Sequence, residues 1–416
     1  MTTELHGVVA PGFEPVADAF LQAFEGAPGM GAALAIVHDG DLVVDLWGGM
    51  ADHRTGRPWD RHTLSVVFSC SKGLMSVLAA RLVQEGLLDY DAPVVDCWPE
   101  FGAAGKAGIT VGDLLAHRAG LAAPREPLSR DDLSDGPAIA DRLARQAPLW
   151  TPGAAHAYHP ITHGWLIGEV VRRVTGLSAG TAFRRFVADP LGAECWIGLP
   201  ERHLPRVARM VVGRTLAELT ARQEAEAEAA GGEDWPGIAM TLGGALPRDL
   251  VGDDPAADGG EGFNDPAVQV AEVPGAGGIG SARALATIWA STFAPGHGGP
   301  LLEDETIEAA TAVRSEGEPF FVVPPPWPRW GAGLQLDSAA RRYVTPCGFG
   351  HDGAGGQVAF ADPGAGVGFA FLTNRMEAGD DRRGTRIVDA LRAVVGAEHP
   401  LTYPNGIPHD EGAKSI

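Results

Sequence analysis

Hydrophobic positions in the first ninety residues follow two different periods. Residues 12–26 carry apolar side chains at helical spacing, and residues 31–49 form two strand-like runs around Asp39-Gly40, a pair typical of a tight hairpin turn. From Ser69 to Gly86, apolar residues occupy most of the helix circumference, which indicates a helix buried in a core and ended by glycine. This part of the chain therefore predicts a helix, a β-hairpin and a buried helix.

The rest of the chain predicts helices in the middle and strands near the end. Helical periodicity recurs at 109–121, 161–176 and 277–293, the last of these opened by Ser281. The acidic, glycine-rich stretch 214–270 suggests a helix end and mobile surface loops, with a lid as the alternative. Strand-like runs follow at 331–337, 356–363 and 366–376, and a helix closes the pattern at 382–396.

We expect the early hairpin and the late strands to share one antiparallel sheet. The fold class is then α/β (α+β), an antiparallel sheet flanked by helices with an α-helical insertion. The predicted domains are a discontinuous α/β domain at 1–75 and 275–416, and a mostly α-helical domain at 76–274 with a variable loop region at 214–270. No tandem repeat of 20 to 50 residues is present.

Composition and charge exclude several classes of protein. The net charge of −21 argues against nucleic-acid binding, which needs clustered lysine and arginine. No run of apolar residues reaches the length of a membrane helix, and the first residues lack a signal-peptide pattern, so we expect a cytoplasmic protein without membrane attachment. The four cysteines, without paired spacing for zinc, are expected to be reduced thiols.

Lysine is rare in this chain, and one of its three lysines lies at the start of the buried helix. Ser69 and Lys72 are three residues apart, so they lie on one helix face, whereas Ser71 points away from Lys72. Free N–H groups and the positive helix end in the first turn stabilise an oxyanion and disfavour an ammonium, so the amine can act as a base. An isolated Ser-x-x-Lys also fits a packed serine and a lysine stem lying on apolar surface.

Two further motifs support a catalytic interpretation. Tyr158-His159-Pro160 contains one of only four tyrosines, and His351-Asp352-Gly353 lies in a glycine-rich turn between predicted strands. With Ser69-x-x-Lys72, these motifs resemble in order the S-x-x-K, Y-x-N and K-T-G motifs of the serine β-lactamase and penicillin-binding-protein superfamily. The resemblance covers nearly the whole chain and is greatest to class C β-lactamases, DD-peptidases and family VIII esterases; residues 109–121 resemble the segment between the first two motifs.

This resemblance implies a mechanism through a covalent intermediate. Ser69 is acylated, and Lys72 and Tyr158 share the removal of its proton and the later activation of water or another acceptor. Which of the two side chains is the base stays open at this point. No cofactor and no metal ion are implied.

The same resemblance assigns the remaining site residues. The oxyanion hole would be the backbone N–H of the nucleophile and that of Ala354, beside the small residue Gly353 on an edge strand. His351 would line the pocket and hydrogen-bond the catalytic tyrosine or the substrate, and His159 belongs to the predicted substrate-binding set. Asp352 is expected to be exposed and to tune His351.

Two departures from the motifs indicate the substrate. Pro160 replaces the asparagine that binds the amide side chain of a β-lactam, and His351 replaces the lysine that attracts its carboxylate. We therefore expect hydrolysis of a small carboxylic ester, with weak or no β-lactam turnover. The alternatives are an acyltransferase of secondary metabolism, a β-lactamase or D-amino peptidase, and a non-enzymatic scaffold; a homo-oligomer is possible on this evidence.

Three other patterns have simpler explanations than catalysis. Ser178 lies in a G-x-S-x-G match, but a helix ends just before it, so we interpret it as a helix cap. The G-x-G-x-x-G match at 275–280 lacks a βαβ context. His156, His159 and His163 lack an acidic partner of the H-E-x-x-H type, so they are expected to face solvent or the pocket.

The remaining notable residues fit packing as well as function. The run 320–331 either walls an acyl pocket with Trp327 and Trp330 or forms a rigid surface turn, and the sequence does not decide between the two. His117 is expected to be a core or capping histidine. Cys70, beside the nucleophile, is expected to pack in the helix core.

Overall fold

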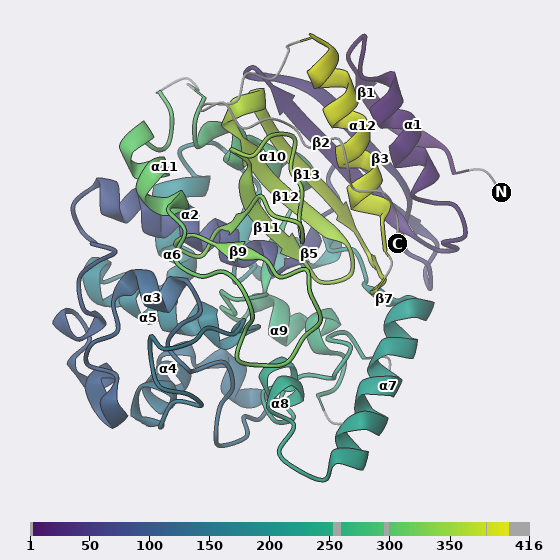
Figure 1. The fold of residues 1–416 in the computed structure, drawn as a ribbon. Helices are drawn as coiled ribbons and strands as arrows, with labels where there is room; N and C mark the ends of the chain where they lie inside the picture. The colour runs from purple at the N-terminus through teal and green to yellow at the C-terminus, as the bar shows by residue number, and fades with distance from the viewer. Residues whose placement is uncertain (1–2, 253–258, 295–298, 380, 399–416) are drawn as a thin grey trace.

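One antiparallel sheet brings together the two ends of the chain (Figure 1). The computed structural model describes residues 3–252, 259–294, 299–379 and 381–398. The strand order is β1-β3-β2-β13-β12-β11-β10-β9, with β4 beside β3, and β2 pairs with β13 as predicted. The strands are β1 (Leu5–Val9), β2 (Gly31–His38), β3 (Asp41–Asp52), β4 (Arg57–Pro58), β9 (Arg329–Trp330), β10 (Gln335–Leu336), β11 (Phe349–Gly353), β12 (Gln357–Asp362) and β13 (Val367–Thr373).

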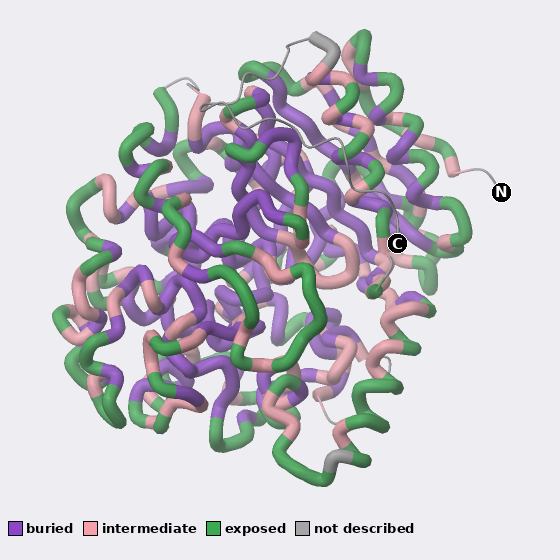
Figure 2. The backbone as a smooth tube through the Cα atoms, in the orientation of Figure 1, coloured by how far each residue is buried: buried purple, intermediate pink, exposed green. Residues whose placement is uncertain are grey.

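Helices cover both faces of this sheet, which explains why its central strands are apolar without alternation. Along β13, Phe369 and Phe371 join the core under α1 (Glu14–Gln22) and α12 (Arg383–Glu398). Ala370 and Leu372 point to the opposite core, which α10 (Ala282–Ser291) and α2 (Cys70–Gln84) cover. Figure 2 shows this buried layer at the centre of the sheet, with exposed residues on the outer helices.

The middle of the chain is mainly helical, as the pattern predicted. Helix α5 ends at left-handed Gly176, and Ser281 caps α10. The helix predicted at 109–121 is much shorter, because His117 and Gly120 both adopt positive φ angles. Besides α2, the helices of this part are α3 (Val111–Leu115), α4 (Gly136–Arg145), α5 (Thr162–Thr175) and α6 (Ala179–Phe183), and α11 (Asp304–Thr311) follows α10.

The stretch 214–270 is more helical than the sequence suggested. It contains α7 (Arg214–Ala230), α8 (Trp235–Thr241) and α9 (Pro266–Val270), while residues 253–258 lie outside the described part. Most of α7 is exposed, and its alanine and glutamate content favours a helix even without a buried face. The acidic composition was therefore misread as loop along α7.

A second, small sheet leads directly to the predicted nucleophile, and the sequence did not reveal it. Its order is β5 (Ser65–Phe68), β8 (Gly278–Gly280) and β6 (Cys195–Ile197); elsewhere β7 (Val211–Val212) pairs with β14 (Arg375–Met376). Helix α2 runs without a break across the predicted boundary at residue 75, and the division into two domains stays a prediction. Within the described residues, no helix is long and apolar enough to span a membrane.

Candidate active site

Ser69 lies at the sharp turn between β5 and α2. It is the N-cap residue of α2, and the residue before it, Phe68, has a left-handed φ of +45°. Such a backbone is strained for a bulky residue and needs support from its surroundings. The Ser71 hydroxyl gives that support, because it donates to the Phe68 carbonyl and accepts from the Gly278 N–H at 2.8 Å. Ser71 is thus a structural serine, and Ser69 is free to face the cavity.

Lys72 contacts Ser69 from a fully buried position. Its Nζ lies 3.1 Å from Ser69 Oγ and donates to the carbonyl oxygens of Pro160 and, at 2.7 Å, Gly275. Burial lowers the pKa of Lys72 well below its usual range, and no carboxylate within the described chain pairs with it. A neutral amine has two N–H bonds, which the two carbonyls accept, so its lone pair is left for the Ser69 hydroxyl.

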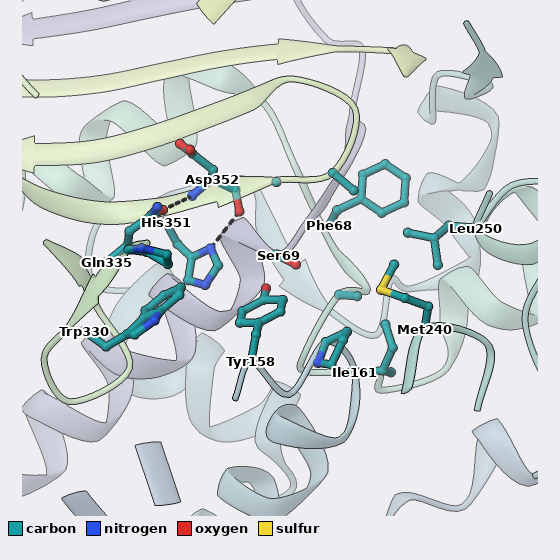
Figure 3. A pocket seen from close by; sticks show the side chains of 15 residues that line it. Phe68, Ser69, Tyr158, Ile161, Met240, Leu250, Trp330, Gln335, His351 and Asp352 are labelled. Atoms are coloured by element: carbon teal, nitrogen blue, oxygen red, sulfur yellow. Dashed lines mark hydrogen bonds between the residues drawn. The ribbon is translucent and has the colours of Figure 1, made fainter. Parts of the chain in front are cut away.

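Tyr158 points its phenol oxygen at Ser69 (Figure 3). Burial raises the pKa of this phenol, an effect that a hydrogen bond with Ser69 offsets in part. The Lys72 Nζ lies 4.8 Å from the centre of the tyrosine ring, and Trp330 stacks on the ring with centroids 5.6 Å apart. Tyr158 is therefore a neutral phenol that can donate a proton near Ser69 Oγ.

His351 lies on β11 and is a neutral imidazole. Burial and then nearby Lys72 lower its pKa to about 3. Its Nδ1 contacts the Asp352 carbonyl oxygen at 2.6 Å, and its Nε2 has no partner among the described residues. The expected hydrogen bond to Tyr158 is absent there, although the two ring centroids are 6.0 Å apart. His351 therefore offers the pocket a polar but uncharged group.

The prediction that Asp352 is exposed was wrong. Because side chains alternate along a strand, Asp352 points to the opposite side of β11 from His351. There it is partly buried and accepts a hydrogen bond from Arg341 Nε at 2.6 Å. Its backbone N–H donates a hydrogen bond to the Gln335 side-chain oxygen at 3.1 Å. Asp352 thus fixes the strand, and its carboxylate does not enter the cavity in Figure 3.

The two residues predicted to supply the oxyanion hole, Ser69 and Ala354, both line the cavity. In the described part of the chain, neither the Ser69 N–H nor the Ala354 N–H donates to a protein acceptor. Gly353 precedes Ala354, and a Cβ there would lie 2.5 Å from the Val67 carbonyl oxygen, so only glycine allows the close approach of β11 to β5. This proximity places the predicted oxyanion donors on neighbouring segments.

Gln357 connects the strands around Ser69, and no pattern in the sequence indicated this role. Its amide nitrogen donates to the carbonyls of Val66 on β5 and Thr373 on β13, each at 3.0 Å. Its amide oxygen accepts from the Thr373 N–H at 2.8 Å. The side chain is buried and fully bonded, so it holds the small sheet against the large one.

The cavity in front of Ser69 has a volume of about 420 Å³ and two unlike sides. Trp330, Gln335 and His351 line one side (Figure 3). The other side is apolar and formed by Phe68, Ile161, Met240 and Leu250. Of the aromatic run 320–331, Trp330 lines the cavity and Trp327 does not. Met240 and Leu250 come from the stretch 214–270, where sequence reasoning gave no site residue.

The three histidines in and around the second motif, His156, His159 and His163, do not line the cavity. His159 is fully buried, its Nε2 accepts from the Leu121 N–H, and its Nδ1 contacts the Ala157 carbonyl oxygen. The structure thus places His159 away from the cavity lining, and we leave it out of the site. His156 and His163 are also buried rather than solvent-facing. Among the described residues, no group of three His, Cys, Asp or Glu side chains is arranged to hold a metal ion.

The two glycine-rich matches supply no nucleophile, although the second places the Gly275 carbonyl at Lys72 and Ala276 at the cavity. Ser178 caps α6, accepting from the Thr181 N–H at 3.3 Å and donating to Glu272 at 2.6 Å, as predicted for a cap. The match at 275–280 runs into strand β8. Neither match contributes a side chain that reaches Ser69 Oγ.

Comparison with known proteins places the chain in a family. The sequence profile of the Beta-lactamase family matches residues 18–393. The chain belongs to the β-lactamase family. It is 34% identical over 376 residues to the esterase/beta-lactamase LipL of Mycobacterium tuberculosis (strain ATCC 25618 / H37Rv), covering 89% of this chain and 83% of LipL. The family resemblance drawn from the three motifs is confirmed.

Solved structures agree with this assignment and with the predicted fold. A family VIII carboxylesterase superposes with a TM-score of 0.80 at 34% identity, over 94% of this chain and 100% of that one. The structure of EstA from Arthrobacter nitroguajacolicus Rue61a gives 0.79 at 32% identity, over 96% and 100%. The fold class, an antiparallel sheet flanked by helices, is therefore confirmed.

Proposed function

We propose that this protein is a serine carboxylesterase that works through an acyl-enzyme on Ser69. The observation that carries the proposal is the environment of Lys72: a buried amine that lies 3.1 Å from Ser69 Oγ and gives its two N–H bonds to backbone carbonyls. Such an amine is poised to accept the serine proton. Relatives named as esterases support the same reaction class.

Acylation begins with Lys72 as the base. Its lone pair takes the Ser69 proton while Oγ attacks the ester carbonyl carbon, and the resulting oxyanion is held by the Ser69 and Ala354 N–H groups. The carbon–oxygen bond to the alcohol then breaks. Tyr158 gives its phenol proton to the departing alkoxide and regains one from the Lys72 ammonium, so the alcohol leaves neutral and both side chains return to their starting state.

Deacylation uses the same groups in reverse. Lys72, through Tyr158, removes a proton from water, and the hydroxide oxygen attacks the acyl carbon. The bond to Ser69 Oγ breaks and the serine recovers its proton, which releases the carboxylic acid. No step requires a metal ion or a cofactor.

The cavity suggests where each half of the ester binds. The leaving alcohol must lie near the Tyr158 hydroxyl that protonates it, on the side of Trp330 and His351. The acyl group then occupies the opposite, apolar side, where Met240 and Leu250 form the wall. An uncharged acyl chain suits this side of the cavity, because no cationic side chain lines it that could pair with an anionic acyl group.

The same lining disfavours β-lactams. A pKa of about 3 keeps His351 uncharged at neutral pH, so it does not attract a substrate carboxylate as a lysine would. Pro160 supplies a carbonyl to Lys72 but has no side-chain amide for the acylamino group of a β-lactam. We therefore expect esters to be hydrolysed far faster than β-lactams.

Hydrolysis of p-nitrophenyl esters and nitrocefin by matched serine variants tests the proposal. We expect Ser69→Ala to lower ester kcat by about 10⁴-fold or more, because the nucleophile is removed. Ser178→Ala, which changes the other candidate serine, should retain kcat within about threefold. Fast nitrocefin turnover would point to a β-lactamase. Ester turnover by Ser69→Ala at the wild-type rate would show that Ser69 is not the nucleophile.

A further inference from the structure

His117 has an unusual backbone and lies directly behind the catalytic tyrosine. It follows α3, its side chain is fully buried, and its φ of +65° lies in the left-handed region. Residues other than glycine seldom adopt that region, and asparagine, aspartate and histidine tolerate it best. A buried residue held in this conformation suggests a constraint from the neighbouring segment.

Two hydrogen bonds from the neighbouring segment end on His117, one on each side of Tyr158. The Ala157 N–H donates to the His117 carbonyl oxygen at 3.2 Å. The His159 N–H donates to His117 Nδ1 at 3.3 Å. Since Nδ1 accepts, the proton of the neutral imidazole is on Nε2. One residue thus fixes the backbone immediately before and after the tyrosine.

The ring of His117 also contacts the tyrosine side chain. Its centroid is 4.9 Å from the Tyr158 ring at 63°, and 4.9 Å from the Trp330 ring at 80°. Nε2 is buried and has no hydrogen-bond partner in the described structure. Its N–H group instead lies among aromatic rings, where N–H···π contacts are possible partners. The imidazole therefore supports both the tyrosine and the tryptophan stacked on it.

The imidazole must stay neutral to make these contacts, because a protonated Nδ1 cannot accept. Burial first, then His163, His159, Lys72 and His351, lower the pKa of His117 well below its usual range. Burial is the largest of these causes and disfavours a charge on the ring, so the acceptor is preserved at neutral pH.

We propose that His117 is a positioning residue that holds the Tyr158 hydroxyl at Ser69. This inference rests on the proposed role of Tyr158 in proton transfer. A displacement of about 1 Å at such a group lowers the rate of the chemical step by about 100-fold without changing how substrate binds. His117 should therefore affect kcat rather than KM.

Two substitutions separate this role from simple packing. His117→Gly keeps the left-handed backbone and the carbonyl but removes the Nδ1 acceptor. His117→Asn tolerates the same backbone and places an amide oxygen near the position of Nδ1. We expect kcat of the glycine variant to fall about 10- to 100-fold at unchanged KM, and the asparagine variant to recover to within about threefold of wild type.

His163→Ala is the matched control. It removes another fully buried imidazole of the same cluster, one that contacts the Leu115 carbonyl oxygen at 3.1 Å and has no hydrogen bond to residues 157–159. We expect a loss of thermal stability comparable to that of His117→Gly, with kcat within about threefold of wild type. Melting temperatures and near-UV circular dichroism show that each variant is folded. If His117→Gly does not fold, kcat of His117→Asn decides alone, and a fall of more than about threefold at unchanged melting temperature would overturn the inference.

Tyr158→Phe tells apart the possible failures. We expect it to lower kcat by about 100-fold or more, and His117→Gly to have little additional effect in that background, since it acts through the lost hydroxyl. Wild-type kcat in Tyr158→Phe would overturn the role of Tyr158 and this inference with it. A large loss in Tyr158→Phe, with either wild-type kcat in His117→Gly or no rescue by His117→Asn, would overturn the inference alone.

Discussion

The charge on Lys72 decides what the two side chains of the first motif can do. An ammonium at this position would donate a hydrogen bond to the Ser69 hydroxyl and would have no lone pair to accept its proton. Burial disfavours the charge, and the Pro160 and Gly275 carbonyls accept both N–H bonds of the amine. Spacing alone predicts that Ser69 and Lys72 meet; the two carbonyls come from distant segments and were not predictable.

The pH dependence of ester hydrolysis follows from the lowered pKa of Lys72. Catalysis needs the neutral amine, so kcat/KM should fall as pH drops through this pKa and reach its plateau well below the usual 10.5. His351, with a pKa of about 3, and His159, at about 4, stay neutral above roughly pH 5 and add no further limb. A blank-corrected pH–rate profile checks this. Activity that rises only near pH 10 would contradict it.

Lys72→Arg keeps a long cation but removes the base. We expect kcat/KM for a p-nitrophenyl ester to fall by about 10³-fold, because a guanidinium does not deprotonate in a protein. Lys106→Arg is the control, since Lys106 is also buried and bonded to two carbonyls, but those belong to Ala103 and Gln146, away from Ser69. Equal losses in the two variants would show that general damage to the fold, rather than loss of the base, explains the result.

Among the elements, the helices and loops of 214–270 do more than composition suggested. Helix α8 and the segment after it bring Met240 and Leu250 to the apolar side of the cavity. The apolar residues of this stretch are too few to show a period, and their position depends on how the chain folds back. The sequence therefore gave no signal for these two wall residues.

Met240→Ala should shift the acyl preference toward longer chains. Removing the methionine side chain enlarges the apolar side, and each additional methylene of the substrate then finds space. We expect kcat/KM for the longer p-nitrophenyl esters to rise about tenfold relative to the acetate. Met50→Ala, at an exposed methionine on β3, is the control. An unchanged chain-length profile would show that Met240 does not limit the acyl group.

At the scale of the whole molecule, the site lies where segments distant in sequence meet. Gln357 on β12 bonds to β5, which leads to Ser69, and to β13 beside it. Its bond to the Val66 carbonyl connects the small sheet to the large one, and its two bonds to Thr373 lie within the large sheet. Stability and the geometry of the nucleophile therefore depend on one buried amide.

Gln357→Leu should be strongly destabilising. It leaves the Thr373 carbonyl and N–H without the partners that Gln357 supplies, at about 1 to 3 kcal/mol for each unsatisfied buried group, and leaves the Val66 carbonyl with the Ser65 hydroxyl. We expect the free energy of unfolding in urea to fall by about 3 kcal/mol or more. Gln22→Leu, on the exposed end of α1, is the matched control. Equal stabilities of the two variants would contradict the role given to Gln357.

Local patterns predicted the elements of this fold better than their long-range contacts. The hairpin at Asp39-Gly40, the buried helix after Ser69 and the cap at Ser178 depend on neighbouring residues, and the structure confirms them. The partners of Lys72 and the small sheet of β5, β6 and β8 depend on contacts between distant residues, which one sequence does not reveal. Cytoplasmic location and oligomeric state stay predictions.

Trapping the acyl-enzyme tests the central claim most directly. Wild-type protein is mixed with excess p-nitrophenyl ester, quenched in acid during turnover, and examined by intact mass and peptide mapping. We predict one added acyl group, located on Ser69, and none in Ser69→Ala. An acyl group on another residue, or ester turnover by Ser69→Ala at the wild-type rate, would contradict the mechanism.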